Sequence, residues 1–489
     1  MKRLLIYICV ISILLITGCK KKTNAQVSAK NKSAEFDESL LKLTNIEDNV
    51  VCSPLAIKSM LKVLEDSTDG NSKKQISIQL GDFKYPSNTN DENMSLTNGF
   101  FIKDSYESSI KEEYTKLLKE KYNSELIVDS FENPESINKW VSDNTFNMIN
   151  DAFDDVSDND FILVNTLAID LDWINTVKND FSFSPIHTTD SCHAWVSDYS
   201  INGAEWVEFE NIKDIVKGLD FACVANKYDL LNVIGEDKIR ETVKGDYAYW
   251  RDHYAYKDEY FEKYYPEPDI YIEKYINELK EDQYKYGFFN SSTDFSYYVD
   301  NSVKVFSKDL KEHNGTNLQY VAIMPKDMSL KSYINSLKIK DVYSYISSLV
   351  SPSYDVYEEG YVTRIHGFIP EFDFASSLDL KDTLNKMYIN DIFDPACSNL
   401  TPISDSNPFI TSFSNKVNIT LSNEGIKAAS LVSAGGMGAG GPEYDYYYEL
   451  PVIDIDLEFN KPFVFFIIDK TTNDIWFEGT VYTPSVYKF

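Results

Sequence analysis

Three short runs of almost uninterrupted apolar residues are the feature that most constrains the fold of this chain. They are Phe161–Ile169, Leu318–Met324 and Phe463–Ile468. A strand that is apolar at every position, and not only at alternate positions, is typically buried on both of its faces. The three runs therefore predict strands at the centre of a large sheet.

Segments with apolar residues at helical spacing occur between these runs. They are residues 36–44, 54–64, 107–122 and 136–149. In the second of them, Pro54 stands where a helix begins and Ser53 fits an N-cap. Because strands and helices both occur over the whole length, we predict an α+β domain with a large central sheet.

The first nineteen residues differ from the rest of the chain. A basic start, Met1–Arg3, is followed by an apolar stretch at 4–16 that is too short to span a bilayer comfortably. The ending Ile16–Cys19 (ITGC) resembles a bacterial lipobox, in which an aliphatic and two small residues precede a cysteine. The resemblance implies that residues 1–18 are a lipoprotein signal peptide and that the Cys19 thiol carries a diacylglycerol. Residues 19–34 are polar and predict a flexible tether.

The charge of the chain bears on its partners. The formal net charge is −30, from 77 acidic and 47 basic side chains. Binding of nucleic acid needs a basic surface, so a nucleic-acid partner is not expected. A strongly acidic exterior favours solubility outside a cell, although it is equally typical of an ordinary solvated surface.

The cysteines do not form a recognisable pattern. They are too few and too scattered for a disulfide framework, and the sequence leaves their pairing open. His187 and His193 flank one of them, but the irregular spacing and the lack of a second cluster predict no metal site, and no cofactor is expected. The four cysteines after Cys19 are Cys52, Cys192, Cys223 and Cys397.

Residues 186–290 break the pattern of the rest of the chain. This segment is acidic and rich in tyrosine, and Ile270–Leu279 has helical spacing. We interpret it as an insertion that decorates the domain. Tyrosine rings offer contact area and a polar tip, so such a segment either binds a protein or sugar or simply packs a large insertion.

Five blocks of sequence, in the family's order, resemble the serpins, a family of serine protease inhibitors. They are similar to a strand entering the second helix, the helix that crosses the main sheet, the next strand, a strand followed by a helix, and the C-terminal strands. The resemblance implies a serpin domain over residues 35–489, with a mainly antiparallel central sheet, further sheets, about eight to nine helices and an exposed reactive-centre loop at 425–458. The blocks are 49–64, 137–149, 163–173, 369–393 and 459–484.

The resemblance implies that a protease attacks this loop and that the cut loop then inserts into the main sheet as a new strand. Alternate side chains of a strand point to opposite faces, and Gly425 offers a flexible pivot at its start. Counting from Gly425, the inward-facing set is small or apolar, and the only charge, Lys427, falls on the opposite set. The alternative is a surface linker rich in glycine and alanine. The inward set is Ile426, Ala428, Ser430, Val432, Ala434 and Gly436, and the hinge comprises Glu424, Gly425 and the first five of these.

Two counts give different scissile bonds. Counting forward from Gly425 by the usual spacing gives Ala439–Gly440, with Met437–Gly438 as the next candidate. Counting back from Phe459 gives a bond near Pro451, which makes the loop about a dozen residues longer than usual, and loop entropy tolerates this cheaply. We prefer the forward count, because the length of inserted strand fixes where the protease ends up. A small residue at the bond suits elastase-like or subtilisin-like proteases.

The resemblance also assigns four positions that take part in opening the sheet: Ser53, Asn165, Trp173 and Asn415. Several residues depart from the family pattern, and these departures weaken the expectation of efficient inhibition more than that of the fold. Asn415 replaces a histidine that precedes the lysine matched by Lys416, and asparagine cannot take up a proton. The other departures are Asn423 for glutamate, Ile426 for threonine or serine, Tyr388 for glycine and Ala56 for serine.

Two functions follow from these features. The first is a monomeric suicide-substrate inhibitor of an extracellular serine protease, or alternatively of a cysteine protease, anchored by lipid to the outer face of the cell membrane. The second is a non-inhibitory surface lipoprotein that binds a protein or carbohydrate through residues 186–290. An enzyme is not expected, because no Ser–His–Asp set or carboxylate pair has motif support and the chain has only 5 histidines.

Overall fold

The structure is a computed structural model, and its chain forms two compact units, which we describe separately. Unit one comprises residues up to Thr44, Cys52–Ala168 and Ser376–Val417, and unit two comprises Asn45–Val51, Ile169–Ala375 and Asn418 onward. The structure describes residues 32–86, 90–122, 124–174, 197–199, 207–209, 218–227, 231, 235–253, 267–281, 287–288, 295–352, 361–422, 425–426 and 452–484.

The helices of unit one include the one predicted at 54–64, which is α3 (Pro54–Asp66). The Ser53 Oγ accepts a hydrogen bond of 3.1 Å from the Ala56 N–H, and Pro54 occupies the first turn, so the predicted cap is confirmed. The other helices are α2 (Lys32–Thr44), α4 (Gly70–Leu80), α5 (Glu112–Tyr122), α6 (Glu135–Asn144) and α13 (Lys381–Lys386), with short 3₁₀ turns η2 (Asp104–Ser109) and η6 (Asp391–Phe393).

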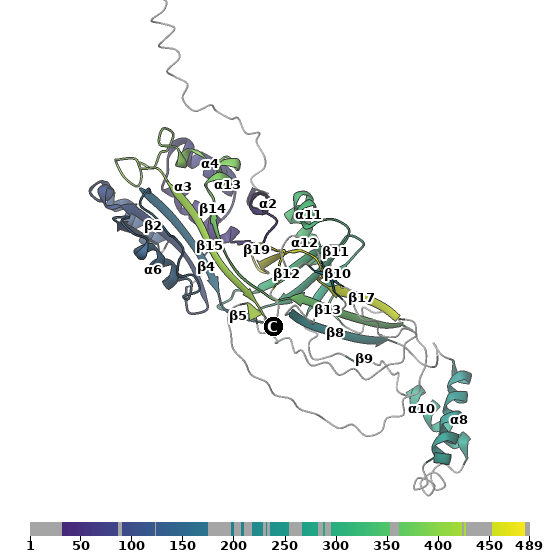
Figure 1. Ribbon diagram of the computed structural model, residues 1–489. Coiled ribbons are helices and arrows are strands. Elements are labelled where there is room, and N and C mark those ends of the chain that lie inside the picture. Colours follow the sequence, from purple (N-terminus) through teal and green to yellow (C-terminus); the bar gives the residue numbers. More distant parts are fainter. Residues whose placement is uncertain are drawn as a thin grey trace, which may run out of the picture. The chain divides into compact units, whose positions relative to one another are not determined.

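The sheet of unit one is built around the predicted strand at 161–169, which is β4 (Phe161–Ile169) and is buried at every position. The strand order is β3-β2-β4-β15, and β14 pairs with β15 (Figure 1). The pairs β2–β3 and β4–β15 are parallel. The other strands are β2 (Met94–Lys103), β3 (Glu125–Asp129), β14 (Phe372–Asp379) and β15 (Ser412–Leu421); the ends of β4, β14 and β15 are assigned to unit two.

The two faces of β4 pack against different helices. Ile162 and Val164 pack in one apolar cluster with Ile137 and Val141 of α6. Asn165 points to the opposite face, where its side chain bonds to the backbone of α3. Because side chains alternate along a strand, this assigns each position of β4 to the α6 face or the α3 face.

Unit two contains two larger sheets. One has the order β1-β19-β18-β12-β11-β10 and the other β17-β13-β8-β9. The predicted runs at 318–324 and 463–468 are β12 (Leu318–Pro325) and β18 (Phe463–Asp469), which pair antiparallel and are buried throughout. The other strands of unit two are β1 (Val50–Cys52), β5 (Leu171–Asp172), β6 (Ser197–Tyr199), β7 (Val207–Phe209), β8 (Gly218–Lys227), β9 (Gly287–Phe288), β10 (Ser296–Val299), β11 (Val303–Asp309), β13 (Tyr361–Pro370), β16 (Gly425–Ile426), β17 (Val452–Glu458) and β19 (Ile475–Val481).

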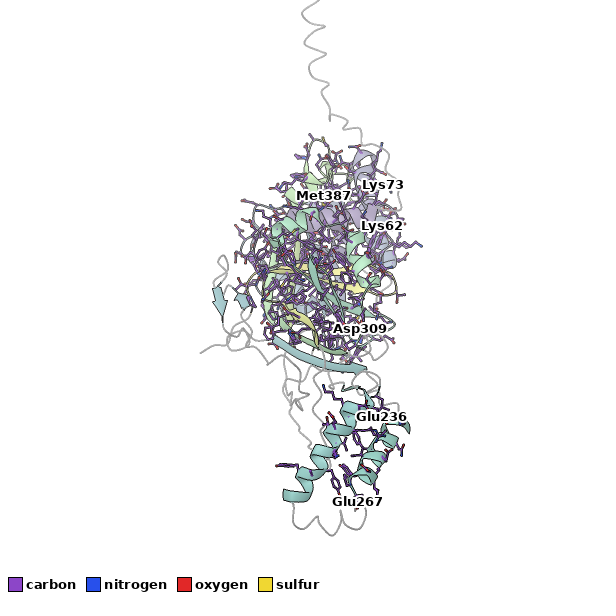
Figure 2. The ribbon with its side chains drawn as sticks, turned by 90° about the vertical axis from the view of Figure 1, so that its right-hand side faces the viewer. Lys62, Lys73, Glu236, Glu267, Asp309 and Met387 are labelled. Atoms are coloured by element: carbon purple, nitrogen blue, oxygen red, sulfur yellow. The ribbon has the colours of Figure 1, made fainter. Side chains whose placement is uncertain are left out.

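Two helices of unit two lie within the segment that we interpret as an insertion. They are α8 (Glu236–His253) and α10 (Pro268–Glu281), which pack against each other, and Glu236 and Glu267 mark opposite ends of the pair (Figure 2). We call this pair the α8–α10 hairpin. The remaining helices of unit two are α11 (Leu330–Ser336) and α12 (Ile339–Ser347).

The predicted α+β class with mainly antiparallel sheets is confirmed. The described residues form eight α-helices outside residues 186–290 and two inside, so the insertion accounts for the excess over the predicted number. None of these described helices is long and apolar enough to cross a membrane.

Three helix boundaries differ from the predictions. The helix expected from 107 begins only at Glu112, because residues 107–109 belong to the 3₁₀ turn η2 and the extended Ile110 forms a β-bridge to Ser404. The helix expected to reach 149 ends at Asn144, because Phe146 and Asn147 have φ of 52° and 59°. Helix α2 begins at Lys32, inside the predicted tether, with an ion pair between Lys32 and Glu35 in its first turn.

Candidate functional site

A cluster of four buried polar side chains lies on the α3 face of the β4–β15 pair in unit one. Asn415 donates from its Nδ2 to the Asn165 Oδ1 at 2.8 Å and accepts at its Oδ1 from the Ser53 N–H at 3.1 Å. Asn165 in turn donates to the Ala56 carbonyl at 2.6 Å and to the Asn98 Oδ1 at 3.1 Å. We call Ser53, Asn98, Asn165 and Asn415 the amide cluster; each is at most 3% exposed.

The amide cluster joins residues that are far apart in the sequence, and three of them were expected from the family resemblance. Asn98 was not expected, because residues 94–103 had not been identified as a strand. Its signal is present in the sequence, since it is a polar residue directly before the apolar stretch 99–102. A buried amide costs free energy unless it is hydrogen-bonded, which explains why these side chains satisfy one another.

Strands β4 and β15 pair directly with each other at five positions. The register runs from Ser412 opposite Ile162 to Lys416 opposite Thr166, with Asn415 directly opposite Asn165. Residues directly opposite each other in a sheet point to the same face, so the two asparagines meet below the strands. No third strand separates β4 from β15 over these described positions.

Lys416 points to the opposite face from the amide cluster and is only 6% exposed. Its Nζ donates to the Ala152 carbonyl at 2.6 Å and to the Ser377 Oγ, and it lies 4.5 Å from the centre of the Phe153 ring. Burial lowers the pKa of Lys416, while the charges of Asp154 and Asp379 act in the opposite direction. Lys416 therefore fastens the segment after α6 to β15 and β14.

Gly425 and Ile426 of the predicted hinge form strand β16 in unit two. Gly425 lies opposite Asp172 and Ile426 opposite Leu171, both antiparallel, and Ile426 also pairs antiparallel with Leu421 of β15. A Cβ at Gly425 would lie 2.4 Å from the Leu171 carbonyl oxygen. Gly425 is therefore needed for the close approach of two backbones, in addition to the pivot that its flexibility suggests.

Trp173 lies beside this hinge in unit two and is buried. Its Nε1 donates to the Ser422 carbonyl at 2.9 Å, and its ring makes an edge contact with Tyr320 at 6.0 Å between centroids. The indole thus holds Ser422 after the end of β15, and the Ser422 N–H donates to the Gly425 carbonyl of β16 at 3.0 Å.

Several predicted site residues lie outside the described part of the chain. The described residues contain no group of three or more His, Cys, Asp or Glu side chains that could hold a metal ion. His187, Cys192 and His193 are not among them. The same is true of Cys19, Glu424, Ala428, Ser430, Val432, Ala434, Met437, Gly438, Ala439 and Gly440.

Two further residues bear on the sequence predictions. Tyr388, which stands where the resemblance expects glycine, has φ of 65°, a left-handed conformation that glycine adopts without strain. Cys397 is disulfide-bonded, which the sequence had left open, whereas Cys52 is buried and forms no disulfide.

Comparison with known proteins gives one family and a set of distant relatives. The family described as "Serpin (serine protease inhibitor)" matches residues 31–188 and 263–484. A "Serine protease inhibitor" of Cyanea capillata is 23% identical over 90% of this chain and 93% of its own length. An "Uncharacterized serpin-like protein" of Methanosarcina acetivorans is 22% identical over 94% and 87%.

Among solved structures, the native state of the thermophilic serpin tengpin is similar, with a TM-score of 0.62 and 17% identity over 94% of this chain and 96% of that one. At this level of identity the likeness shows a shared fold. The family match leaves out residues 189–262, which lie within the segment 186–290.

Proposed function

The chain belongs to the serpin family, and we propose that it is a suicide-substrate inhibitor of an extracellular serine protease. Serpins are in general not enzymes but proteins that bind target serine proteases, so the expectation that this chain is not an enzyme is confirmed. The proposal adds the mechanism, in which the protease cuts the reactive-centre loop and the loop inserts between β4 and β15.

The observation that carries the proposal is the register of β16. Its two residues already pair antiparallel with β5 on one side and with β15 on the other. If either register continued along the chain, Gly435 would lie between Ile162 and Ser412, and Val432 would lie between Asn165 and Asn415. In the structure, these residues of β4 and β15 face each other directly. We call the boundary between two such paired strands a seam. Agreement between the two sides supports this seam as the place of insertion.

The same register supports the predicted alternation of the loop. Ala428 would lie between Ile169 and Ile419, which are 5% and 4% exposed. Val432 would share the α3 face with the amide cluster, because residues opposite each other point the same way. Ser433 would lie beside Val164 on the α6 face, where space is limited by the apolar cluster. Small side chains at these positions are what such an insertion needs.

Insertion requires the backbone pairing of β4 with β15 at five positions to break, together with two sets of side-chain contacts. The hydrogen bond between Asn415 and Asn165 must open, while each amide keeps its backbone partner, the Ser53 N–H or the Ala56 carbonyl. The segment held by Lys416 must also give way, because α6 lies over the strands that separate. Both sets are polar contacts that can re-form with new partners.

In the proposed reaction, the protease serine attacks the carbonyl carbon of Ala439, the bond to the Gly440 nitrogen breaks, and the new amine leaves with a proton. The acyl-enzyme then remains attached to the loop while it inserts. Fourteen inserted residues at about 3.4 Å each would carry the enzyme some 48 Å. An elastase-like or subtilisin-like protease fits the small residue, and a cysteine protease could form the equivalent thioester.

The substitution Ala428→Arg tests the mechanism. A guanidinium between Ile169 and Ile419 would be buried without a partner, at a cost of about 3–5 kcal/mol, so insertion would slow while deacylation would not. We expect the variant to be cut as a substrate with at least a tenfold loss of covalent complex. The measurement is the ratio of SDS-resistant complex to cleaved protein after incubation with pancreatic elastase or subtilisin.

Lys427→Arg is the matched control, because it changes the neighbouring residue on the opposite face and keeps its charge. It should trap protease as the unmodified chain does. Equal trapping by Ala428→Arg would show that the register or the mechanism is wrong, and no complex with any protease tested would favour the alternative function below.

We also propose that the mature protein begins at lipidated Cys19 and lies on the outer face of the cell membrane. The lipobox-like ITGC supports this, and the disulfide of Cys397 is typical of an oxidising compartment. We expect Cys19→Ala to abolish incorporation of labelled fatty acid and to release the protein from the membrane fraction. An unlabelled wild-type protein would contradict the proposal.

A non-inhibitory binding protein is the second candidate. The α8–α10 hairpin favours it, because it exposes Tyr249 at 54% and Ile270 at 47% in a region that the family match partly leaves out. The trapping assay separates the two candidates.

A further inference from the structure

The insertion and the reactive-centre loop are rooted at the same end of one sheet in unit two. In the β17-β13-β8-β9 sheet, Lys227 at the end of β8 lies opposite Tyr361, and Val452 at the start of β17 lies opposite Val362. Gly287 at the start of β9 lies opposite Ala225. The chain therefore leaves for the α8–α10 hairpin at Lys227, returns from it at Gly287, and returns from the loop at Val452. All three positions lie at the same end of the sheet.

The separation of these roots follows from strand spacing. Val452 and Asn226 are the two neighbours of Val362, one on each side. Strands lie about 4.8 Å apart, so the two roots are about 10 Å from each other. The loop and the insertion thus start from nearby positions at one end of the sheet.

The lengths of the segments that join the hairpin to β8 and β9 limit how far it can lie from this end of the sheet. Seven residues join Lys227 to Gly235 and five join Glu281 to Gly287. At about 3.5 Å per step, the hairpin begins within about 28 Å of Lys227 and ends within about 21 Å of Gly287. Helix α8, with 18 residues, adds about 27 Å of length.

The hairpin is a structured body with its own core and ion pairs. Ile239 and Val243 of α8 and Ile276 of α10 are fully buried. Across the helices, Arg240 pairs with Glu273 at 2.6 Å and Lys280 pairs with Glu236 at 3.2 Å. The hydrogen bonds from Arg240 lower the pKa of both glutamates, which therefore remain ionised in any ordinary buffer. Such a body presents a fixed surface.

That surface is acidic and partly aromatic. Helices α8 and α10 together contain 9 acidic and 6 basic side chains. Arg240 and Lys280 are already engaged with glutamates, whereas Asp237 and Glu241 are exposed one turn apart on α8. Tyr249 and Ile270 add exposed contact area.

We propose that the α8–α10 hairpin is a second contact surface for the target protease and selects proteases with a basic surface beside their active site. This inference rests on the proposed function. A protease of about 230 residues is about 45 Å across, so an enzyme held on a loop with one root about 10 Å from the insertion would come within reach of the hairpin. Opposite charges on the two bodies accelerate their encounter, and like charges slow it.

The test compares two proteases with the same preference for small residues, a cationic and an anionic elastase. The readout is the second-order rate constant of loop cleavage, counting trapped and released products together. Replacing residues 235–281 by a short Gly/Ser linker should lower the rate constant for the cationic enzyme about tenfold at low salt and weaken the dependence of that rate constant on salt. For the anionic enzyme, the rate constant should be unchanged or higher.

A charge variant leaves the buried residues and the interhelical ion pairs of the hairpin in place. Asp237→Lys with Glu241→Lys should lower the cationic rate constant and raise the anionic one, each about threefold to tenfold. Glu113→Lys with Glu120→Lys on α5 of unit one makes the same change in net charge and should not alter the ratio of the two rates. Circular dichroism checks that each variant is folded.

The outcomes separate this inference from the proposed function. If the ratio of the two rate constants is the same with and without the hairpin, the inference is wrong even when complexes form. If the ratio changes while no complex forms with either enzyme, the hairpin contact stands and the inhibitory mechanism fails.

Discussion

The strand pairs β4–β15 and β12–β18 are both largely buried but are held together differently. The β4–β15 pair is parallel over five positions and meets through the amides of Asn165 and Asn415. The β12–β18 pair is antiparallel over six positions, and Tyr320 stacks on Phe465 at 6.0 Å. Burial alone therefore does not distinguish a seam that opens from one that stays closed; the side chains that face each other do.

The physical difference lies in what separation costs. Parallel pairing is slightly weaker per residue, and amide hydrogen bonds contribute about 1 kcal/mol net because they can be replaced by others. Interlocked aromatic side chains lose their contacts outright when separated. If the proposed mechanism holds, the chain places its exchangeable contacts where a strand must enter.

Cleavage of the loop near Ala439 should produce the largest effect. Residues 427–436 would each gain ladder hydrogen bonds, and at about 1 kcal/mol per residue the domain would be stabilised on the order of 10 kcal/mol. Thermal melts before and after limited elastase digestion measure this. Cleaved Ala428→Arg should gain much less, and an unchanged or lower midpoint for the cleaved wild-type chain would remove the distinction between the two seams.

Phe465→Ala tests the permanent seam. It removes a fully buried ring that contacts both Tyr320 and Phe372 at 5.1–6.0 Å between centroids. We expect a loss of about 3–5 kcal/mol in the free energy of unfolding. Chemical denaturation measures this loss. Phe465→Leu keeps an apolar side chain of similar volume and serves as the control, with an expected loss of less than about 1.5 kcal/mol in the free energy of unfolding.

Asn415→Ala tests the opening seam and should have the smallest effect of the three. It leaves the Ser53 N–H and the Asn165 Oδ1 without their partner, at a cost of about 1–3 kcal/mol. Thr420→Ala, on the same strand but bonded at the surface to Asp373, should change stability by less than about 0.5 kcal/mol. A loss for Asn415→Ala as large as that for Phe465→Ala would contradict the comparison.

The sequence predicts these two seams unequally. The runs at 161–169, 318–324 and 463–468 identify β4, β12 and β18 to within a residue, because an unbroken apolar run has few alternatives. Strand β2 was missed, since Thr97 and Asn98 interrupt its apolar pattern. Helix α6 was expected to be longer, because its apolar periodicity continues past the left-handed residues that end it.

The amide cluster shows a second limit. Nothing local in Ser53, Asn165 or Asn415 reveals that they meet, since more than 100 residues separate each from the next. Only resemblance to a family assigned them together. Strand β16 has two residues, and its pairing depends on strands β5 and β15, so no periodicity could have indicated it.

Strand β16 also affects how fast a new strand can form. The slow step of building an ordered array is usually its first contacts, which restrict the chain before any cooperative gain, and each later residue adds to an existing end. Gly425 and Ile426 already occupy that end, with Gly425 fitting where a methyl group would collide with Leu171. Insertion would then be growth without nucleation, so its speed relative to deacylation depends on how quickly each following pair along the seam separates.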